Sequence, residues 1–500
     1  MEKSSIKSVV FVSPYPHYAK DILEPTSYPP MGIAYMAGFL ESKGLKCHVI
    51  DAYILKMTNE DVFKRIRELK PDMVGIATNV VTIREGCELS EKIKDNLNIR
   101  VVLGGAYAAS SIGKILEKSK ADCIIVGEGE SIIWNLVDKG FDLPNTKGTA
   151  YLEHGEVKVN PREIPIEDLD SMPFPAWHLL PDLKLYKSKS RRTPVVTMFT
   201  SRGCPYQCIF CSSSSKNSVF GPRFRTRSPE NVVKEIEHVT QKFGVKQIDI
   251  LDDNFTLDLE RAGKILDLIA EKKIDIAISF PNGVRADRLT KELVHKMKLA
   301  GTYRVGIGIE SGDEEILKIL KKSLDLETVL TAIKWFREEN IIVSGFFMLG
   351  LPHDTPETMQ KTIDFALKSN PHIANFSMAI PMIGTEMYEI VKREGTFVKS
   401  TEDGLSTGYN AITEGYFEFK GFKKEDVLKY QRMAYKKFYL RPSKMLELLL
   451  SIRTMDELRW LIHTSYPLLK GIFNPKNIIK IKARNREKPV LYTIEGNPAN

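Results

Sequence analysis

The feature that most constrains the fold is a repeated alternation between short β-branched runs and longer amphipathic stretches. In the first 140 residues, five such runs are typical of strands, and the segments between them have helical periodicity. Parallel strands need crossover connections, so strands separated by helices predict an α/β fold with a doubly wound parallel sheet over residues 1–140. The five runs lie at 8–13, 46–51, 73–77, 100–103 and 123–126.

A second alternation predicts a partial (β/α)6 barrel of the TIM type over residues 191–398. Between the two alternations, residues 141–190 are rich in Pro and Asp and predict a linker over the surface, with a hairpin turn at His154-Gly155-Glu156. Residues 399–500 are expected to be mostly helical. The six barrel strands are expected at 195–200, 247–251, 276–280, 304–309, 341–348 and 374–379.

The cysteines indicate a cluster site rather than cross-linking. Three of the six, Cys204, Cys208 and Cys211, have the spacing CxxxCxxC in TSRGCPYQCIFCSSSS, directly after the first barrel strand. Three thiolates leave one iron of a cubane cluster open to another ligand. A structural zinc would need a fourth ligand nearby, whereas the closest histidines in sequence, His178 and His238, are distant.

Small and polar residues follow the strands of the first sheet. Ligands of doubly wound sheets bind at the carboxyl ends of the strands, and small residues let them approach the backbone. The alternative is that these residues only form tight turns. The expected ligand-binding positions are Thr78, Asn79, Gly104, Gly105, Gly127 and Glu128.

Composition and charge narrow the classes of protein. Hydrophobic residues make up 43% and charged residues 27%, and no apolar run approaches the length of a membrane span. The N-terminal apolar run stops at Pro14 without a cleavage site, so we expect a cytoplasmic protein. The formal net charge is +8, and between Lys420 and Lys488 there are 18 Lys and Arg against 6 Asp and Glu.

This basic C-terminal region also carries apolar residues on one side. Such a pattern is typical of a helix that packs on its own domain, and the alternative is peripheral contact with a membrane or an anionic amphiphile. We expect no nucleic acid partner. The apolar residues are Met445, Leu446, Leu448, Leu449, Leu450, Trp460 and Leu461.

The cysteine segment resembles the signature loop of the radical S-adenosylmethionine (SAM) superfamily, and the resemblance extends over residues 194–395. It implies that the amino and carboxylate groups of SAM chelate the open iron. One electron from the 4Fe-4S cluster then cleaves SAM to a 5'-deoxyadenosyl radical, which abstracts a substrate hydrogen. The electron would come from a donor such as a flavodoxin or a ferredoxin.

The resemblance also implies roles for residues at the ends of the barrel strands. Phe210 and Gly350 resemble residues that contact adenine, and Arg285 resembles a partner of the methionine carboxylate. Asp252, Asp253 and the adjacent Asn254 lie where the methionine amino group is expected. Glu310 and Ser311 resemble residues that bind the ribose or amino group. The alternative for each is barrel-mouth structure or helix capping.

The N-terminal domain is similar to the Rossmann-like cobalamin-binding domains found ahead of radical SAM barrels. The similarity rests on YPPMGIAYMAGFLESKG, VVLGGAYAAS and DCIIVGEGE, and with DLDSMPFPAW and YLRPSKMLELLLSIRTMDELRWL it covers nearly the whole chain. The chain thus resembles class B radical SAM methyltransferases. It lacks a DxHxxG motif, so no such histidine would reach the lower face of the corrin.

The resemblance implies methylation of an unactivated carbon, or in a few relatives phosphorus, in a small-molecule or lipid-like substrate. Relatives use the same cofactors for ring closure or rearrangement, so these reactions remain open. A methylthiotransferase would need a second cluster, for which Cys47, Cys87 and Cys123 supply the number of thiols, although lone cysteines in strands and helices are usually buried. A corrinoid carrier or sensor is the non-enzymatic alternative.

Overall fold

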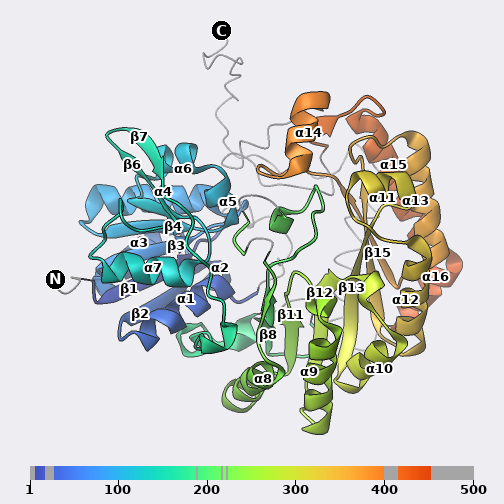
Figure 1. The fold of residues 1–500 in the computed structure, drawn as a ribbon, viewed down its shortest axis with the longest axis horizontal. Helices are drawn as coiled ribbons and strands as arrows, with labels where there is room; N and C mark the ends of the chain where they lie inside the picture. The colour runs from blue at the N-terminus through green and yellow to red at the C-terminus, as the bar shows by residue number, and fades with distance from the viewer. Residues whose placement is uncertain are drawn as a thin grey trace.

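The computed structural model describes residues 6–16, 28–186, 190–214, 218–220, 223–398 and 415–451. It contains two large sheets that lie side by side, one from the N-terminal part of the chain and one from its middle (Figure 1). Both alternations predicted from the sequence are confirmed as parallel strands joined by helices. None of the helices in these ranges is long and apolar enough to cross a membrane.

The first sheet has the strand order β2-β1-β3-β4-β5-β6-β7. Its first five strands are parallel and match the predicted runs to within one residue. The strands are β1 (Ser8–Ser13), β2 (Lys46–Asp51), β3 (Met73–Ala77), β4 (Arg100–Gly104), β5 (Cys123–Ile125), β6 (Thr149–Glu153) and β7 (Glu156–Val159).

The last two strands correct the interpretation of residues 141–190 as a linker. The predicted turn is present, with positive φ at both His154 and Gly155, but the hairpin it closes pairs antiparallel with β5. Positive φ at both central residues suits the right-handed twist of a hairpin. The sheet therefore continues past residue 140, and the hairpin covers the edge that β5 would otherwise expose.

Helices pack on both faces of this sheet, as a doubly wound fold requires. Val9 and Phe11 of β1 face the cluster that includes α1 and α7, whereas Val10 and Val12 face α3, α4 and α6. A strand buried on both faces has a continuous apolar sequence, which explains the unbroken VVFV run. The helices are α1 (Met31–Ser42), α2 (Ala52–Leu55), α3 (Asn59–Leu69), α4 (Ile83–Asn96), α5 (Ala106–Ser110), α6 (Ile112–Ser119) and α7 (Gly129–Asp138).

The second sheet is the predicted six-stranded parallel barrel sheet, in the order β15-β14-β13-β12-β11-β8. The third barrel strand was expected to end at Phe280, but with a register shift between Phe280 and Val284 β12 continues to Val284. The strands are β8 (Val195–Met198), β11 (Gln247–Ile250), β12 (Ala277–Val284), β13 (Thr302–Glu310), β14 (Ile342–Leu349) and β15 (Ile373–Met378). The helices are α8 (Pro229–Phe243), α9 (Leu259–Glu271), α10 (Lys291–Leu299), α11 (Glu314–Ile319), α12 (Leu326–Glu338) and α13 (Pro356–Ser369).

The segment that joins the two sheets is buried in part, which also differs from the predicted surface linker. Trp177 and Tyr186 are 2% and 0% exposed, and the Ala176 N–H donates to the Ala34 carbonyl at 2.9 Å. The Tyr186 hydroxyl donates to Asp51 at the end of β2, at 2.8 Å. Trp177 and Tyr186 belong to the apolar cluster of the barrel, so these aromatic side chains pack the segment against the second domain while its hydrogen bonds reach the first.

The described C-terminal elements include three helices, of which α15 (Lys424–Tyr439) covers the edge of the barrel sheet. The Tyr439 hydroxyl and the Gln431 amide donate to backbone carbonyls of β15, at 2.8 Å each. Met445, Leu446, Leu449 and Leu450 are exposed, while Trp460 and Leu461 lie outside the described residues, so membrane contact stays a prediction. The elements are α14 (Glu386–Glu394), β16 (Thr396–Phe397), β17 (Phe417–Glu418), α15 (Lys424–Tyr439) and α16 (Pro442–Ser451).

The buried Asp51 makes the stability of the N-terminal domain depend on pH. Burial raises the pKa of Asp51 from 3.8 to about 6, although the Tyr186 hydrogen bond opposes this. Because the folded chain holds this proton more tightly than the unfolded chain, its stabilising effect is complete below about pH 4 and is lost as the pH rises through 6. Asp51→Asn should therefore raise the free energy of unfolding at pH 8 by about 2 kcal/mol.

Urea unfolding at pH 5 and pH 8 measures this effect, and the gain should be smaller at pH 5 by about 1 kcal/mol. Asp72 is a matched control, because hydrogen bonds from Lys7 and Ser8 outweigh its burial and lower its pKa. Asp72→Asn should destabilise the protein at pH 8. Equal destabilisation by both substitutions at pH 8 would contradict the account of Asp51.

Candidate active site between two sheet edges

The carboxyl edges of the two sheets face each other across a buried contact. After β8 the chain forms the short strand β9 (Ser201–Arg202), which pairs with β10 (Arg225–Thr226). Arg202 donates to Glu128 at 2.7 Å and to Glu130 at 2.6 Å, and Arg225 also pairs with Glu128. These glutamates follow β5 and begin α7, so the ion pairs join the end of one sheet to the end of the other.

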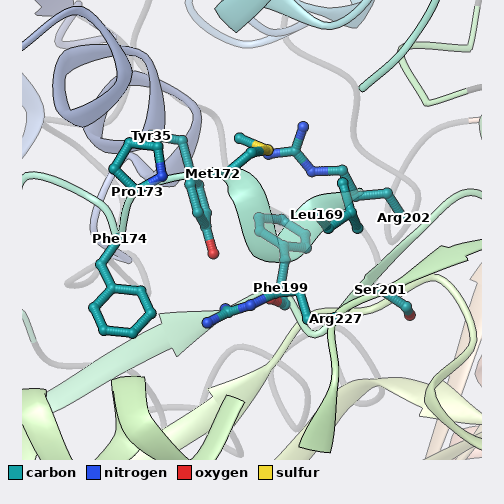
Figure 2. A pocket seen from close by; sticks show the side chains of 9 residues that line it. All are labelled: Tyr35, Leu169, Met172, Pro173, Phe174, Phe199, Ser201, Arg202 and Arg227. Carbon is teal, nitrogen blue, oxygen red and sulfur yellow. The ribbon is translucent and has the colours of Figure 1, made fainter. Parts of the chain in front are cut away.

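Aromatic side chains complete this contact. The Arg202 guanidinium carbon lies 5.3 Å from the ring centroids of both Tyr35 and Phe220. Figure 2 shows Tyr35 on α1 with its hydroxyl directed towards Phe199 and Arg227, in a small pocket also lined by the connecting segment. The contact therefore combines paired charges with apolar packing.

The cysteine loop lies directly beyond Arg202 and is held by backbone hydrogen bonds. The Ile209 N–H donates to the Leu320 carbonyl at 3.1 Å, and the Met387 N–H donates to the Ile209 carbonyl at 2.9 Å. The Ser214 hydroxyl donates to the carbonyls of Cys208 and Cys211, at 2.6 and 2.8 Å. The loop is thus fixed between the end of α11 and the start of α14.

The three thiols of this loop lie close enough to influence one another. Burial raises the pKa of Cys204 to about 11, and the charges of Cys208 and Cys211 add to this effect. Burial also raises the pKa of Cys208, and the ammonium group of Lys322 opposes the increase. All six cysteines of the chain are free thiols.

The spacing of these thiols suits a cluster better than a single ion. Within the part of the chain that the structure describes, no three His, Cys, Asp or Glu side chains converge closely enough for one metal ion. A cubane cluster binds its cysteines at separate iron atoms. Three neighbouring free thiols on one fixed loop therefore fit a 4Fe-4S cluster.

Asp252 does not have its predicted role. This carboxylate is 2% exposed and accepts hydrogen bonds from the Thr200 N–H and hydroxyl and from the Ser201 hydroxyl, the last at 2.6 Å. Its oxygens are therefore used to tie the end of β11 to the end of β8. Asp252 was predicted to bind SAM, but its carboxylate instead holds Thr200 and Ser201, which lead into the cysteine loop.

The next two residues leave polar atoms without a partner. Asp253 accepts a hydrogen bond from Ser213, beside the cysteine loop, but its Oδ2 atom is buried and unpaired among the described residues. Both side-chain atoms of Asn254 are also buried and unpaired, and the residue is 1% exposed. Buried polar groups are nearly always hydrogen-bonded, so these atoms need a ligand or water.

Cationic groups lie on the other side of the loop. Lys322 pairs with Glu310 at 2.9 Å, and its ammonium group is 5.9 Å from the ring centroid of Phe210. Glu310 has φ +70°, an uncommon conformation for a residue other than glycine and one that clusters at functional sites. These contacts place Phe210, Glu310 and Lys322 together near Cys208.

Arg285 is near the loop but is already engaged by its own neighbours. Its guanidinium carbon lies 3.7 Å from the ring centroid of Tyr206, and it pairs with Asp287 at 2.9 Å. It also donates to the carbonyls of Lys322 and Ser323. To pair with a carboxylate of SAM, as predicted, the Arg285 guanidinium group would have to share its donors between SAM and these neighbours.

Ser311 and Gly350 are explained by packing. The Ser311 hydroxyl bonds Thr362 at 3.2 Å and accepts from the Asp313 N–H at 3.1 Å, so it faces α13 rather than the cysteine loop. Gly350 has φ +71°, and a Cβ there would lie 2.7 Å from Val427. The glycine therefore permits the close approach of α15. These contacts correct the prediction for Ser311 and give Gly350 a packing role.

The edge of the first sheet keeps some of its predicted ligand positions. Asn79 is exposed, and a Cβ on Gly104 would have nothing closer than 4.0 Å. At Gly105, with φ +115°, a Cβ would come within 1.8 Å of the Thr78 carbonyl, so a turn explains this glycine. Asn79 and Gly104 thus keep the position at the carboxyl edge where ligands of doubly wound sheets bind.

Glu128 is the clear exception at this edge. It is 4% exposed and pairs with two arginines of the barrel domain, so its carboxylate is not available to cobalamin. Gly127, beside it, has φ +132° and serves the turn into α7. The prediction identified a position at the interface but assigned it to the wrong partner.

The other three cysteines cannot share one cluster. Cys47 and Cys123 belong to the apolar cluster on one face of the first sheet, and Cys87 belongs to the cluster on the opposite face. Burial raises the pKa of both Cys47 and Cys87 to about 12. These residues are small apolar core residues, as sequence reasoning indicated.

Five further residues of the site were not predicted from the sequence: Arg202, Arg225, Glu130, Lys322 and Tyr206. Arg202 and Tyr206 lie within or beside the cysteine motif, so their proximity could have been noticed. Nothing local distinguishes Lys322 from the adjacent Lys321. The partners of Arg202 are more than 70 positions away, at sequence separations of 74 and 72.

Comparisons with known proteins agree with this geometry. A family model described as the radical SAM superfamily matches residues 198–366, and one described as the B12 binding domain matches residues 25–137. An uncharacterized methyltransferase of Pyrococcus horikoshii is 32% identical over 428 residues, covering 84% of this chain and 90% of that protein. An anaerobic magnesium-protoporphyrin IX monomethyl ester cyclase of Rubrivivax gelatinosus is 28% identical over 374 residues, covering 73% of this chain and 66% of that protein.

The fold also matches a solved structure. The radical SAM methyltransferase TsrM of Kitasatospora setae, with cobalamin and a 4Fe-4S cluster bound, aligns with a TM-score of 0.69. The identity is 17%, and the match covers 93% of this chain and 99% of that chain. The cofactors of this protein are thus a 4Fe-4S cluster, SAM and cobalamin. The chain belongs to the family of cobalamin-dependent radical SAM enzymes that includes methyltransferases.

Proposed function

We propose that the protein transfers a methyl group to an unactivated carbon of a small-molecule or lipid-like substrate in the cytoplasm. The observation that carries this proposal is the meeting of the two carboxyl edges, which puts the cysteine loop opposite the edge that fits a corrin. The relative from Pyrococcus horikoshii, which is named a methyltransferase, supports methylation as the reaction.

When bound, the three cofactors supply one-electron cleavage of SAM and methyl transfer. The chain itself holds and orients the cofactors and excludes water from the site. Cys204, Cys208 and Cys211 hold the cluster, and the unpaired atoms of Asp253 and Asn254 bind the polar end of SAM. The Asp253 carboxylate would bind the ammonium group of SAM, and the Asn254 amide would bind the carboxylate of SAM. Both buried side chains would then have hydrogen-bond partners.

The buried interface has a second role in this proposal. The ion pairs of Arg202 and the aromatic rings around it close one side of the space between the sheet edges. Excluding water protects reactive species from side reactions. The reducing electron comes from a donor such as a flavodoxin or a ferredoxin, which a chemical reductant replaces in the assay.

The reaction type is tested with the reconstituted protein and a cell extract as the source of substrate. The protein is incubated anaerobically with SAM, cobalamin and reductant, and the products are analysed by mass spectrometry. We expect 5'-deoxyadenosine together with a substrate that gains one methyl group, because the relative from Pyrococcus horikoshii is named a methyltransferase. Loss of two hydrogens without a methyl gain would instead show ring formation, as the cyclase relative would suggest.

The cluster ligands are tested by two matched sets of substitutions. Ala at Cys204, Cys208 or Cys211 should remove most of the bound iron and the iron–sulfur absorbance, since each supplies one cluster ligand. Ala at Cys47, Cys87 or Cys123 should keep both, at a cost of about 1 kcal/mol in unfolding free energy from lost packing. Iron analysis and visible absorbance of the anaerobically assembled proteins give the result. A loop variant that still cleaves SAM would refute the assignment.

A further inference from the structure

Two arginines lie directly opposite each other close to the cysteine loop. Arg202 and Arg225 are paired across the β9–β10 ribbon, and their side chains are only 5% and 3% exposed. Like charges at facing positions repel, and a buried charge without a partner is costly. The ribbon therefore needs carboxylates, and Glu128 and Glu130 of the other domain supply them.

We call these four residues the Arg202 network. Their hydrogen bonds hold the two guanidinium groups and the two carboxylates in a defined arrangement. The two terminal nitrogens of Arg202 reach different carboxylates, with Nη1 at 2.7 Å from Glu128 and Nη2 at 2.6 Å from Glu130. Glu128 accepts from both arginines. A guanidinium group is planar and rigid, so it fixes the orientation of its partners as well as their distance.

The network contributes more to geometry than to stability. Replacing a buried ion pair by well-packed apolar residues often leaves stability unchanged or increases it, whereas removing one partner is strongly destabilising. An interface that only had to be stable could have been apolar, as the nearby packing of Tyr35 and Phe199 is. Charged groups here add orientation, which apolar contacts supply poorly.

The network is also connected to both cofactor edges through very short segments. Only Gly203 separates Arg202 from Cys204, and it has φ +83°. On the other side, Gly127 and Glu128 connect the end of β5 to α7. A displacement at the network therefore moves the cysteine loop relative to the edge of the first sheet.

We infer that Arg202, Arg225, Glu128 and Glu130 are positioning residues that set the distance and orientation between the cluster loop and the corrin-binding edge. This inference rests on the proposed function, because it requires a group at each edge. The residues act through the backbone on either side of them and not by contact with a cofactor. Their loss changes the relation between the two cofactors before it prevents either from binding.

The test uses the whole chain, loaded anaerobically with iron, sulfide and hydroxocobalamin and then reduced. The reduced cluster and cob(II)alamin are both paramagnetic, so their magnetic coupling reports distance and orientation without any substrate. Arg202→Lys keeps the charge but cannot bridge two carboxylates, and Glu130→Gln keeps a hydrogen bond but loses the charge. We expect both variants to hold iron and cobalt at wild-type content while losing the wild-type pattern of dipolar broadening.

Glu447→Gln is the matched control. Glu447 pairs with Arg337 of α12 and with Lys444 of α16, whose side chain is 1% exposed, so it joins outer helices of the barrel side and not the two sheets. This variant should melt at a lower temperature and keep the wild-type broadening.

The inference is overturned if both network variants show wild-type broadening at full loading, or if the control alters it equally. If Arg202→Lys does not fold, Glu130→Gln decides alone. A wild-type protein that binds no cluster or no corrin refutes the proposed function instead.

Discussion

The rest of the structure depends on buried ion pairs that join the ends of two sheets. Each sheet has its own apolar core, with helices on both faces of the first and along the outside of the second. The core of the second sheet also includes Tyr35 of α1, so apolar packing joins the two domains as well. Arg202 and Arg225 add buried ion pairs with Glu128 and Glu130 to this contact, which brings both carboxyl edges to the same space. In the proposed function, this contact brings the two cofactor sites into one reaction site.

Separate interactions hold the different parts of the cysteine loop in position. Asp252 ties the loop's approach to β11, backbone hydrogen bonds fix the loop against α11 and α14, and Lys322 adds positive charge beside Cys208. Asp253 and Asn254 carry buried polar atoms without a partner among the described residues, and Asp253 reaches the loop through Ser213. Their place beside the loop, and not the unpaired atoms alone, makes them candidates for ligand binding.

Much of the fold was predictable because strand and helix periodicities are local properties of the sequence. All eleven parallel strands were placed by their apolar runs, and the cysteine spacing identified the loop. Misjudged features depend on distant contacts: the hairpin after His154 was given to a linker because its pairing with β5 leaves no mark in the sequence. Asp252, Ser311 and Glu128 looked like ligand residues because strand-end polar groups often are, whereas their partners Thr200, Thr362 and Arg202 lie far away in the chain. Lys322 was missed for the same reason.

The most direct measurement of the central claim is a crystal structure of the anaerobically loaded protein with its cluster, SAM and cobalamin. The account predicts that the corrin lies over the edge formed by Asn79 and Gly104 and faces Cys204, Cys208 and Cys211 across the space between the sheets. The ion pairs of Arg202 would be intact beside it. A corrin bound elsewhere, or domains turned apart with those ion pairs broken, would contradict the account.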